Sequence, residues 1–200
     1  MLCLKNNELE AGTHRILFSY SKKGKAALLS HLALIDVFSR ALLAARLPVA
    51  WTEGFNPMPK LDYAAPLAIG IAARAEIALT DMQHYVEKAE FINAINKKLP
   101  EGVFAEDALC FTVPHGVKKY SAAALLWGFE YETECGTDCI PAKEDKHYRE
   151  QRFPDGGIWG LTRRAVLAAL PAAPPRPYFE LFSELYDLTP PLQNLTQTDK

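Results

Sequence analysis

The chain has 200 residues, of which 49% are hydrophobic and 23% are charged. This length corresponds to one large domain or two small ones, and the composition is that of a soluble protein with a buried core. No apolar run approaches the ~20 residues that a membrane-spanning helix needs. The N-terminus, MLCLKNNELE, lacks the apolar core of a signal peptide. We therefore expect a cytoplasmic protein with no membrane partner.

The net charge of -2 is unevenly distributed along the chain. Residues 1–60 contain eight Lys or Arg and four Asp or Glu, whereas residues 121–200 contain eight and twelve. A basic N-terminal part on an otherwise acidic protein indicates an anionic partner. Taken alone, the cluster Lys22, Lys23 and Lys25 is better explained as a solvated surface.

The first elements follow from the apolar pattern. We expect residues 1–12 to form a flexible tail. His14 to Tyr20 alternates apolar and polar residues and predicts a strand, followed by a turn over 21–24. Ser30 is a predicted N-cap for a helix that ends near Ala45. The apolar face of this helix is expected to contain Leu32, Ile35, Phe38 and Leu42.

The pattern then predicts one more helix and several strands. The strands are expected over 48–52, 61–67, 72–79 and 103–113, and the helix over 85–99. The resulting order, βαββαβ, is that of the ferredoxin-like fold. We therefore predict an α+β protein with an antiparallel sheet and two helices on one face, occupying residues 13–116.

Residues 117–188 are too few for a second unit of this kind, and we expect them to extend or cap the first sheet. The pattern predicts a strand over 123–135 and a mobile loop over 136–157. Thr162 is expected to cap a short helix over 163–170, and a strand is expected over 178–186. Residues 189–200 are predicted to form a flexible tail.

The segment Glu53 to Lys60 is predicted to be a rigid loop. Pro57 and Pro59 fix their own φ angles, and Gly54 and Asn56 are residue types that tolerate positive φ. An exposed aromatic ring beside a basic side chain suits stacked bases and phosphates. We therefore interpret this loop as a surface that presents Phe55, Asn56 and Lys60 to a partner.

The sequence contains few other motifs that carry chemistry. Cys135 and Cys139 are separated by three residues without the further ligands of a zinc or iron–sulfur site, so we expect no metal. No phosphate-binding loop or dinucleotide fingerprint is present in the sequence, and no cofactor is expected. His31 is a candidate acid or base. Asp36 lies five residues away, off the helical face of His31, so spacing supports no catalytic pair.

Four short motifs lie along the N-terminal half of the chain. Their residues are Ser30, His31, Leu32, Leu34, Phe38, Arg40, Ala41, Gly54, Phe55, Asn56, Pro57, Pro59, Lys60, Pro66, Leu67 and Gly70. With them, residues 14–110 resemble the radical-SAM-associated domain family of unknown function. The typical family pattern is a Ser-His-Leu-Asp-Leu helix start, Phe-x-Arg-Ala, Gly-Phe-Asn-Pro-His-Pro-Lys and Pro-Leu-x-x-Gly. This chain departs from it with Ala33 in place of the acidic residue and Met58 in place of the second histidine.

Members of this family stand alone or follow a cobalamin-binding radical-SAM enzyme, so the resemblance implies an accessory module of such an enzyme, acting on RNA. If the acid and histidine of the family pattern were catalytic, Ala33 and Met58 would disable that activity here, which favours binding over catalysis. Two alternatives remain open, an enzyme that uses His31 as acid or base, and a protein–protein interaction domain. The expected contact residues are Lys22, Lys23, Lys25, Ser30, His31, Arg40, Phe55, Asn56 and Lys60.

Overall fold

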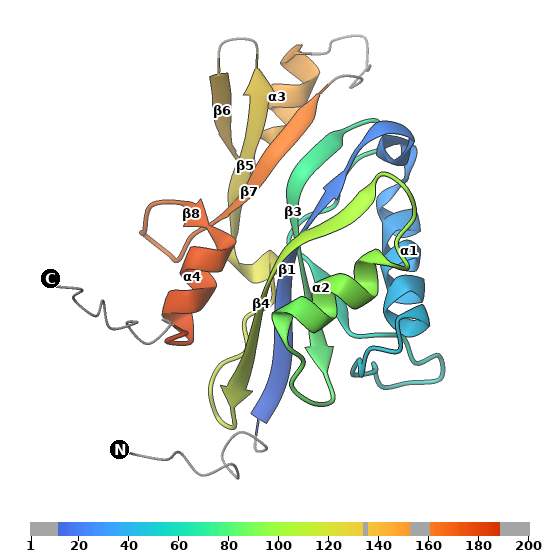
Figure 1. Ribbon diagram of the computed structural model, residues 1–200. Coiled ribbons are helices and arrows are strands. Elements are labelled where there is room, and N and C mark those ends of the chain that lie inside the picture. The colour runs from blue at the N-terminus through green and yellow to red at the C-terminus, as the bar shows by residue number, and fades with distance from the viewer. Residues whose placement is uncertain (1–11, 134–135, 153–160, 189–200) are drawn as a thin grey trace, which may run out of the picture.

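The computed structural model describes residues 12–133, 136–152 and 161–188. Within these ranges eight strands form one sheet in the order β4-β1-β3-β7-β5-β6, with β2 paired to β3 and β8 paired to β7 (Figure 1). The strands are β1 (Gly12–Lys22), β2 (Leu61–Tyr63), β3 (Ala72–Met82), β4 (Val103–Pro114), β5 (Leu126–Thr133), β6 (Gly136–Pro141), β7 (Thr162–Ala168) and β8 (Arg176–Pro177). The α-helices are α1 (His31–Ala44), α2 (Lys88–Asn96), α3 (Asp145–Arg152) and α4 (Tyr178–Leu185). No helix in these ranges is long and apolar enough to cross a membrane.

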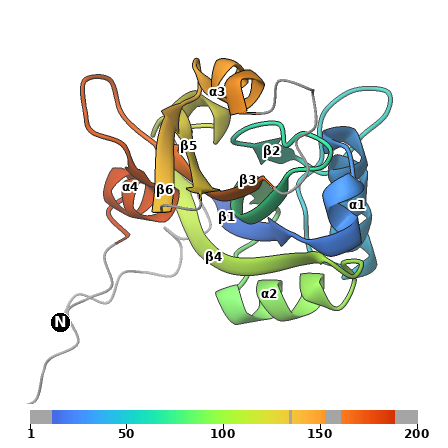
Figure 2. The same ribbon diagram turned by 90° about the horizontal axis from the view of Figure 1, so that it is seen from above.

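The main hydrophobic core lies between β1 and the helices α1 and α2. The ring of Phe18, from β1, lies 5.5 Å from the ring of Phe38 on α1 and 5.3 Å from the ring of Phe91 on α2. All three side chains are fully buried. Because one side chain contacts both helices, α1 and α2 cover the same face of the sheet (Figures 1 and 2).

The helix α4 packs against a different part of the sheet. Its residue Phe182 contacts Phe111 of β4 edge-to-face at 6.0 Å, and Tyr186, just beyond the helix, stacks on Phe111 at 4.9 Å. Tyr178, Leu181 and Phe182 are buried at spacings of three and four residues, which is helical periodicity. The predicted strand over 178–186 is therefore wrong.

Strand β7 is the element that joins the two parts of the sheet. It pairs in parallel with β3 only at Ala72–Thr162 and Ala73–Arg163, and antiparallel with β5 along most of its length. The predicted helix over 163–170 is wrong, because this run of apolar residues is buried in a central strand rather than on one helical face. Buried strands and buried helix segments give the same apolar pattern when they are short.

Residues 136–152 form the edge strand β6 and the helix α3, so the predicted mobile loop is wrong over this range, and residues 153–157 lie outside the described part of the chain. The predicted tail over 189–200 lies outside it as well, as does the predicted tail over 1–12 except for Gly12, which is the first residue of β1 and not part of a tail. The strand expected over 48–52 makes only two isolated bridges, Val49–Met82 and Trp51–Pro59. On α1, Leu32 is exposed, and Leu34 takes its place among the buried residues.

These differences change the fold class. The protein has a mixed α/β architecture, with a sheet that is larger than a ferredoxin-like sheet and that contains one parallel pair. The predicted ferredoxin-like arrangement is therefore not confirmed.

The outer edge of the sheet at β4 is capped by a side chain. Asn96, the last residue of α2, donates from Nδ2 to the carbonyl of Ala105 at 2.9 Å and accepts from the Ala105 N–H at 2.8 Å. The amide therefore satisfies both backbone groups of a residue on a strand edge. Unpaired edge groups are where another chain adds a strand, so this contact protects the edge.

We expect Asn96→Asp to destabilise the protein by about 1–3 kcal/mol, because the carboxylate cannot donate to the carbonyl of Ala105 and would repel it. Urea unfolding would measure this loss. The matched control is Lys97→Ala, which changes the neighbouring residue but removes no contact with Ala105. A loss of the same size in both variants would show that the amide is not what protects the edge.

Candidate functional site

The predicted rigid loop is the tip of a short hairpin between α1 and β2. Backbone hydrogen bonds join Lys60 N–H to the carbonyl of Ala50 and Thr52 N–H to the carbonyl of Met58, both at 2.8 Å. The Thr52 hydroxyl also accepts from the Met58 N–H at 3.0 Å. The base is tied to β3, where Thr80 Oγ1 donates to the carbonyl of Lys60 at 2.9 Å. The loop is therefore held in one shape by its own backbone.

Phe55 and Asn56 lie at the tip of this hairpin. The Phe55 side chain has a relative exposure of 106%, so its ring packs on nothing in the described part of the chain. Among the described residues Asn56 makes no side-chain hydrogen bond, and Thr52 supplies the contact that closes the loop. The Asn56 amide therefore does not bond the backbone of its own loop within these residues, and it faces solvent.

The nine predicted contact residues do not converge on one surface. Lys23, Lys25, Ser30 and His31 lie at the N-terminal end of α1, and the hairpin lies at its other end (Figure 1). With 14 residues, α1 separates the two groups by about 20 Å. Arg40 is exposed on α1 and pairs with Asp36 at 2.8 Å. A partner that contacts both groups must therefore extend along the helix.

Lys22 is not part of the basic surface on which we expected it. Its side chain has no exposed surface, and Nζ donates to the carbonyls of Ala27 and Leu29 at 3.1 Å and of Ala68 at 3.2 Å. Lys22 thus links the segment before α1 to the loop before β3. Burial lowers the Lys22 pKa to about 8, against the opposing effect of Glu76.

His31 lies beside a cluster of buried aromatic residues that sequence reasoning missed. Its imidazole packs edge-on against Tyr63 at 5.1 Å, and Tyr63 packs against Tyr20 at 6.1 Å. The buried atoms His31 Nδ1, Tyr63 Oη and Tyr20 Oη have no hydrogen-bond partner in the described ranges. Burial, and then the charge of Lys22, lower the pKa of His31 and so favour the neutral form of its imidazole.

A buried ion-pair network connects this cluster to the later strands. Arg163 of β7 has an exposure of 2% and donates to both carboxylate oxygens of Glu76 on β3, which has an exposure of 1%, at 3.2 and 3.3 Å. The guanidinium also stacks over the Phe129 ring at 3.9 Å. Tyr131 donates to Asp145 at 2.6 Å and accepts from Arg163 at 3.3 Å. The only sequence signal for this network was a charged residue inside each of two apolar runs.

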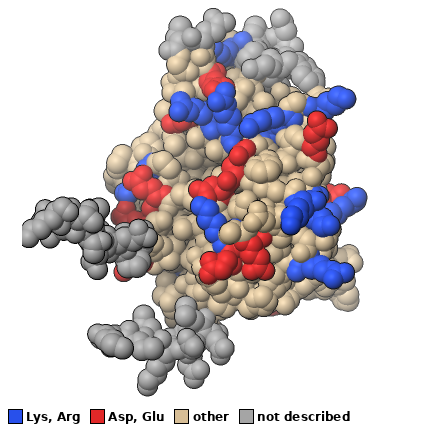
Figure 3. Space-filling view, viewed as in Figure 1, with Lys and Arg blue, Asp and Glu red and all other residues tan. Residues whose placement is uncertain are grey.

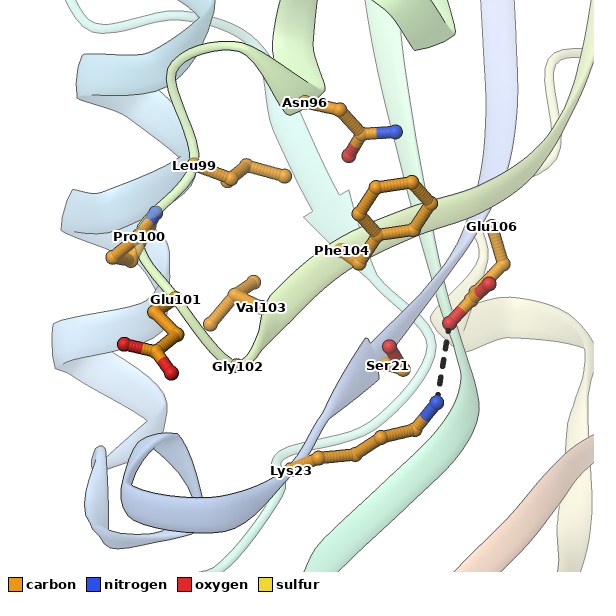
Figure 4. Close-up of a pocket in the computed structure, with 10 residues that line it drawn as sticks. All are labelled: Ser21, Lys23, Asn96, Leu99, Pro100, Glu101, Gly102, Val103, Phe104 and Glu106. Atoms are coloured by element: carbon orange, nitrogen blue, oxygen red, sulfur yellow. Dashed lines mark hydrogen bonds and ion pairs between the residues drawn. The ribbon is translucent and has the colours of Figure 1, made fainter.

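An open pocket of about 460 Å³ lies beside Lys23, between the end of β1 and the start of β4 (Figure 4). The ring of Phe104 projects into it from β4, and Lys23 pairs with Glu106 at 3.5 Å along one side. A neighbouring hollow of about 600 Å³ shares Lys23 and adds Gly24 and Lys25. Both hollows combine lysine with the Glu101 carboxylate, so neither has a single charge sign.

The face that contains α2 and β4 shows the same mixture. Lys and Arg side chains lie next to Asp and Glu side chains across it, without a broad region of one sign (Figure 3). No group of three or more metal-ligating side chains occurs in the described ranges. Cys139 is exposed there, whereas Cys135 lies outside them. The prediction that these cysteines bind no metal therefore stays a prediction.

The fold and the site together define a mixed α/β protein with an ordered aromatic hairpin and a half-buried histidine. The chain belongs to a family described as an uncharacterized protein conserved in bacteria, DUF2344, whose model matches residues 15–152. The match covers both the hairpin and the N-terminal end of α1. A search of curated proteins gives no match to this chain.

Proposed function

We propose that this protein is an accessory binding module that contacts single-stranded RNA through the tip of its hairpin. The observation that carries this proposal is the contrast between an internally bonded loop and the full exposure of Phe55 at its tip. A rigid loop loses little conformational entropy when it binds. An exposed ring offers a stacking surface to any base, which is how proteins hold single strands without reading their sequence.

The charged and polar groups around the ring support the same partner. Lys60 is exposed and forms no ion pair with any described residue, so its ammonium is available to a phosphate. Asn56 is exposed and its amide offers hydrogen bonds to a base edge. The exposed Lys23 and Lys25 at the far end of α1 supply further cations for a strand that runs along the helix.

The second part of the proposal is the partner enzyme, a radical-SAM enzyme to which this module presents the RNA. It rests on the resemblance of residues 14–110 to the radical-SAM-associated domains. In the same way, the strand order β4-β1-β3, with β2 on β3 and both α1 and α2 on one face, supports a ferredoxin-like origin for the first part of the sheet. Affinity purification with the radical-SAM protein encoded nearest to this gene tests the partnership.

The RNA proposal is tested by Phe55→Ala. We expect this variant to bind a fluorescent single-stranded RNA about 5- to 150-fold more weakly, because stacking of one base contributes about 1–3 kcal/mol. Its melting temperature should hardly change, since an exposed substitution costs within about 0.5 kcal/mol. Fluorescence anisotropy and thermal unfolding measure the two effects on the same samples.

The matched control is Phe104→Ala, which removes a half-exposed ring from β4 instead. A second arm is Lys60→Ala, which should flatten the salt dependence of binding by about 0.7, the value for one phosphate contact to a single strand. If Phe55→Ala binds RNA like the wild type, the hairpin is not an RNA surface. Loss of the enzyme from the purification in that same variant would assign the hairpin to a protein partner.

A further inference from the structure

The N-terminal end of α1 carries hydrogen-bond donors that nothing in the described chain accepts. Ser30 caps the helix by accepting from the Ala33 N–H at 3.1 Å, and its carbonyl accepts from Leu34. The N–H groups of His31 and Leu32 precede these and have no acceptor in the described ranges. The first turn contains no acidic residue. Free N–H groups and the helix dipole together favour an anion at this end.

Two buried phenols, Tyr63 beside His31 and Tyr20 beside Tyr63, give the second, independent observation. Tyr20 has no exposed surface and Tyr63 has an exposure of 8%, yet neither hydroxyl has a partner among the described residues. Buried Tyr hydroxyls usually find a partner, and each exception requires an explanation. Tyr178 shows the ordinary case, because its hydroxyl donates to the carbonyl of Ala122 at 2.7 Å. Tyr63 contacts His31 at the helix end, and Tyr20 adjoins Tyr63 while its ring also packs against Phe38, further along α1, at 4.8 Å.

The charges around this cluster favour an anion. Lys22 is the charged group that acts on His31, and the three hydrogen bonds of its ammonium fix the positive charge in place. The carboxylate near Tyr20 is that of Glu76, which is held by Arg163. The cluster therefore combines donors with a fixed positive charge, and its nearest carboxylate is already paired. His31 is only half buried, so the cluster reaches the surface through the imidazole.

We propose that the N-terminal end of α1 binds an anionic oxygen-bearing group, a phosphate or a carboxylate, that accepts hydrogen bonds from the hydroxyls of Tyr63 and Tyr20. The ligand is a small molecule that enters beside His31. This site is separate from the hairpin, which lies at the other end of α1, and it does not rest on RNA binding.

The test is Tyr63→Phe, which removes one hydroxyl and keeps the ring contacts. Titrations with inorganic phosphate and with acetate are followed through the His31 imidazole resonances by NMR. In the wild type we expect at least one of the two anions to shift these resonances saturably. The anion that binds with the higher affinity shows whether the ligand group is a phosphate or a carboxylate. In Tyr63→Phe we expect an affinity at least about tenfold weaker, because a hydrogen bond to a charged group contributes about that factor. Tyr20→Phe should behave in the same way.

Thermal unfolding separates this proposal from a structural role. Removal of an unpartnered hydroxyl should leave the melting temperature unchanged or raise it, whereas Tyr178→Phe, the matched control, should lower it without changing anion binding. Phe55→Ala should leave the anion-induced shifts of the His31 resonances unchanged. A failure of the RNA proposal for the hairpin is therefore distinguishable from a failure of the anion-site proposal. The proposal is overturned if neither anion shifts His31 in the wild type, or if both phenylalanine variants bind as the wild type does. It is also overturned if Tyr63→Phe melts as low as Tyr178→Phe.

Discussion

Arg163→Met is expected to destabilise the protein by about 3–5 kcal/mol, the usual result when one partner of a buried ion pair is removed. Arg163 and Glu76 are almost fully buried and are bonded through both carboxylate oxygens. Without the guanidinium, the Glu76 carboxylate stays in the interior with Lys22 as its remaining cation. Burial already raises the pKa of Glu76, and the loss of Arg163 should raise it further.

The control is the double variant Glu76→Met with Arg163→Met, which should be much closer to the wild type, because an apolar pair of similar size replaces the charges. Urea unfolding at several pH values gives a second check. A raised folded-state pKa means that the folded chain binds the extra proton, so the deficit of Arg163→Met should shrink as the pH falls toward the ordinary pKa of a Glu side chain. A deficit under 1 kcal/mol, or one that does not depend on pH, would contradict this account.

Lys22→Met is expected to cost about 3 kcal/mol, because three carbonyl groups lose their donor at once and a single unsatisfied buried group costs about 1–3 kcal/mol. These carbonyls belong to Ala27, Leu29 and Ala68, so the loss should loosen the segment that leads into α1. The matched control is Lys23→Met. That neighbouring side chain is exposed and pairs with Glu106 at 3.5 Å, so its removal should cost less than about 1 kcal/mol.

Two further measurements on Lys22→Met test the electrostatic account. NMR titration of His31 should show a higher pKa than in the wild type, because the positive charge that disfavours the imidazolium is gone. The folded-state pKa of Lys22, about 8, lies below the ordinary 10.5, so the unfolded chain binds more protons between these values. The stability gap between wild type and Lys22→Met should therefore widen as the pH rises through this window. An unchanged His31 pKa would contradict the account.

Local sequence signals were sufficient for much of the N-terminal part. Ser30 caps α1 as expected, because a capping residue acts on its own first turn. The strands β1, β3 and β4 follow from their alternation, and the hairpin was predicted to be rigid from its prolines and confirmed to be so by its backbone bonds. These features depend on residues close together in the chain.

Of the elements predicted after residue 116, the strand expected over 123–135 is confirmed as β5, whereas the helix over 163–170 and the strand over 178–186 are wrong. In β7, apolar residues lie between two neighbouring strands, and the same run in a shorter window fits a helix. The candidate site could not be predicted from the sequence for a related reason. Tyr20, Tyr63, Glu76 and Arg163 come from four strands, and no local pattern indicates which buried polar residue meets which.

The position of β7 has a consequence for how the chain folds as it is synthesised. A strand from residues 162–168 lies between β3 and β5, which are made much earlier. Until translation has passed it, β5 and β6 have no connection through the sheet to β1, β3 and β4. A fragment cut at residue 152, where the family match ends, would also leave Glu76 buried without its arginine. Expression of the matched segment alone should therefore give an incompletely folded, aggregation-prone product, since an open strand edge recruits other chains.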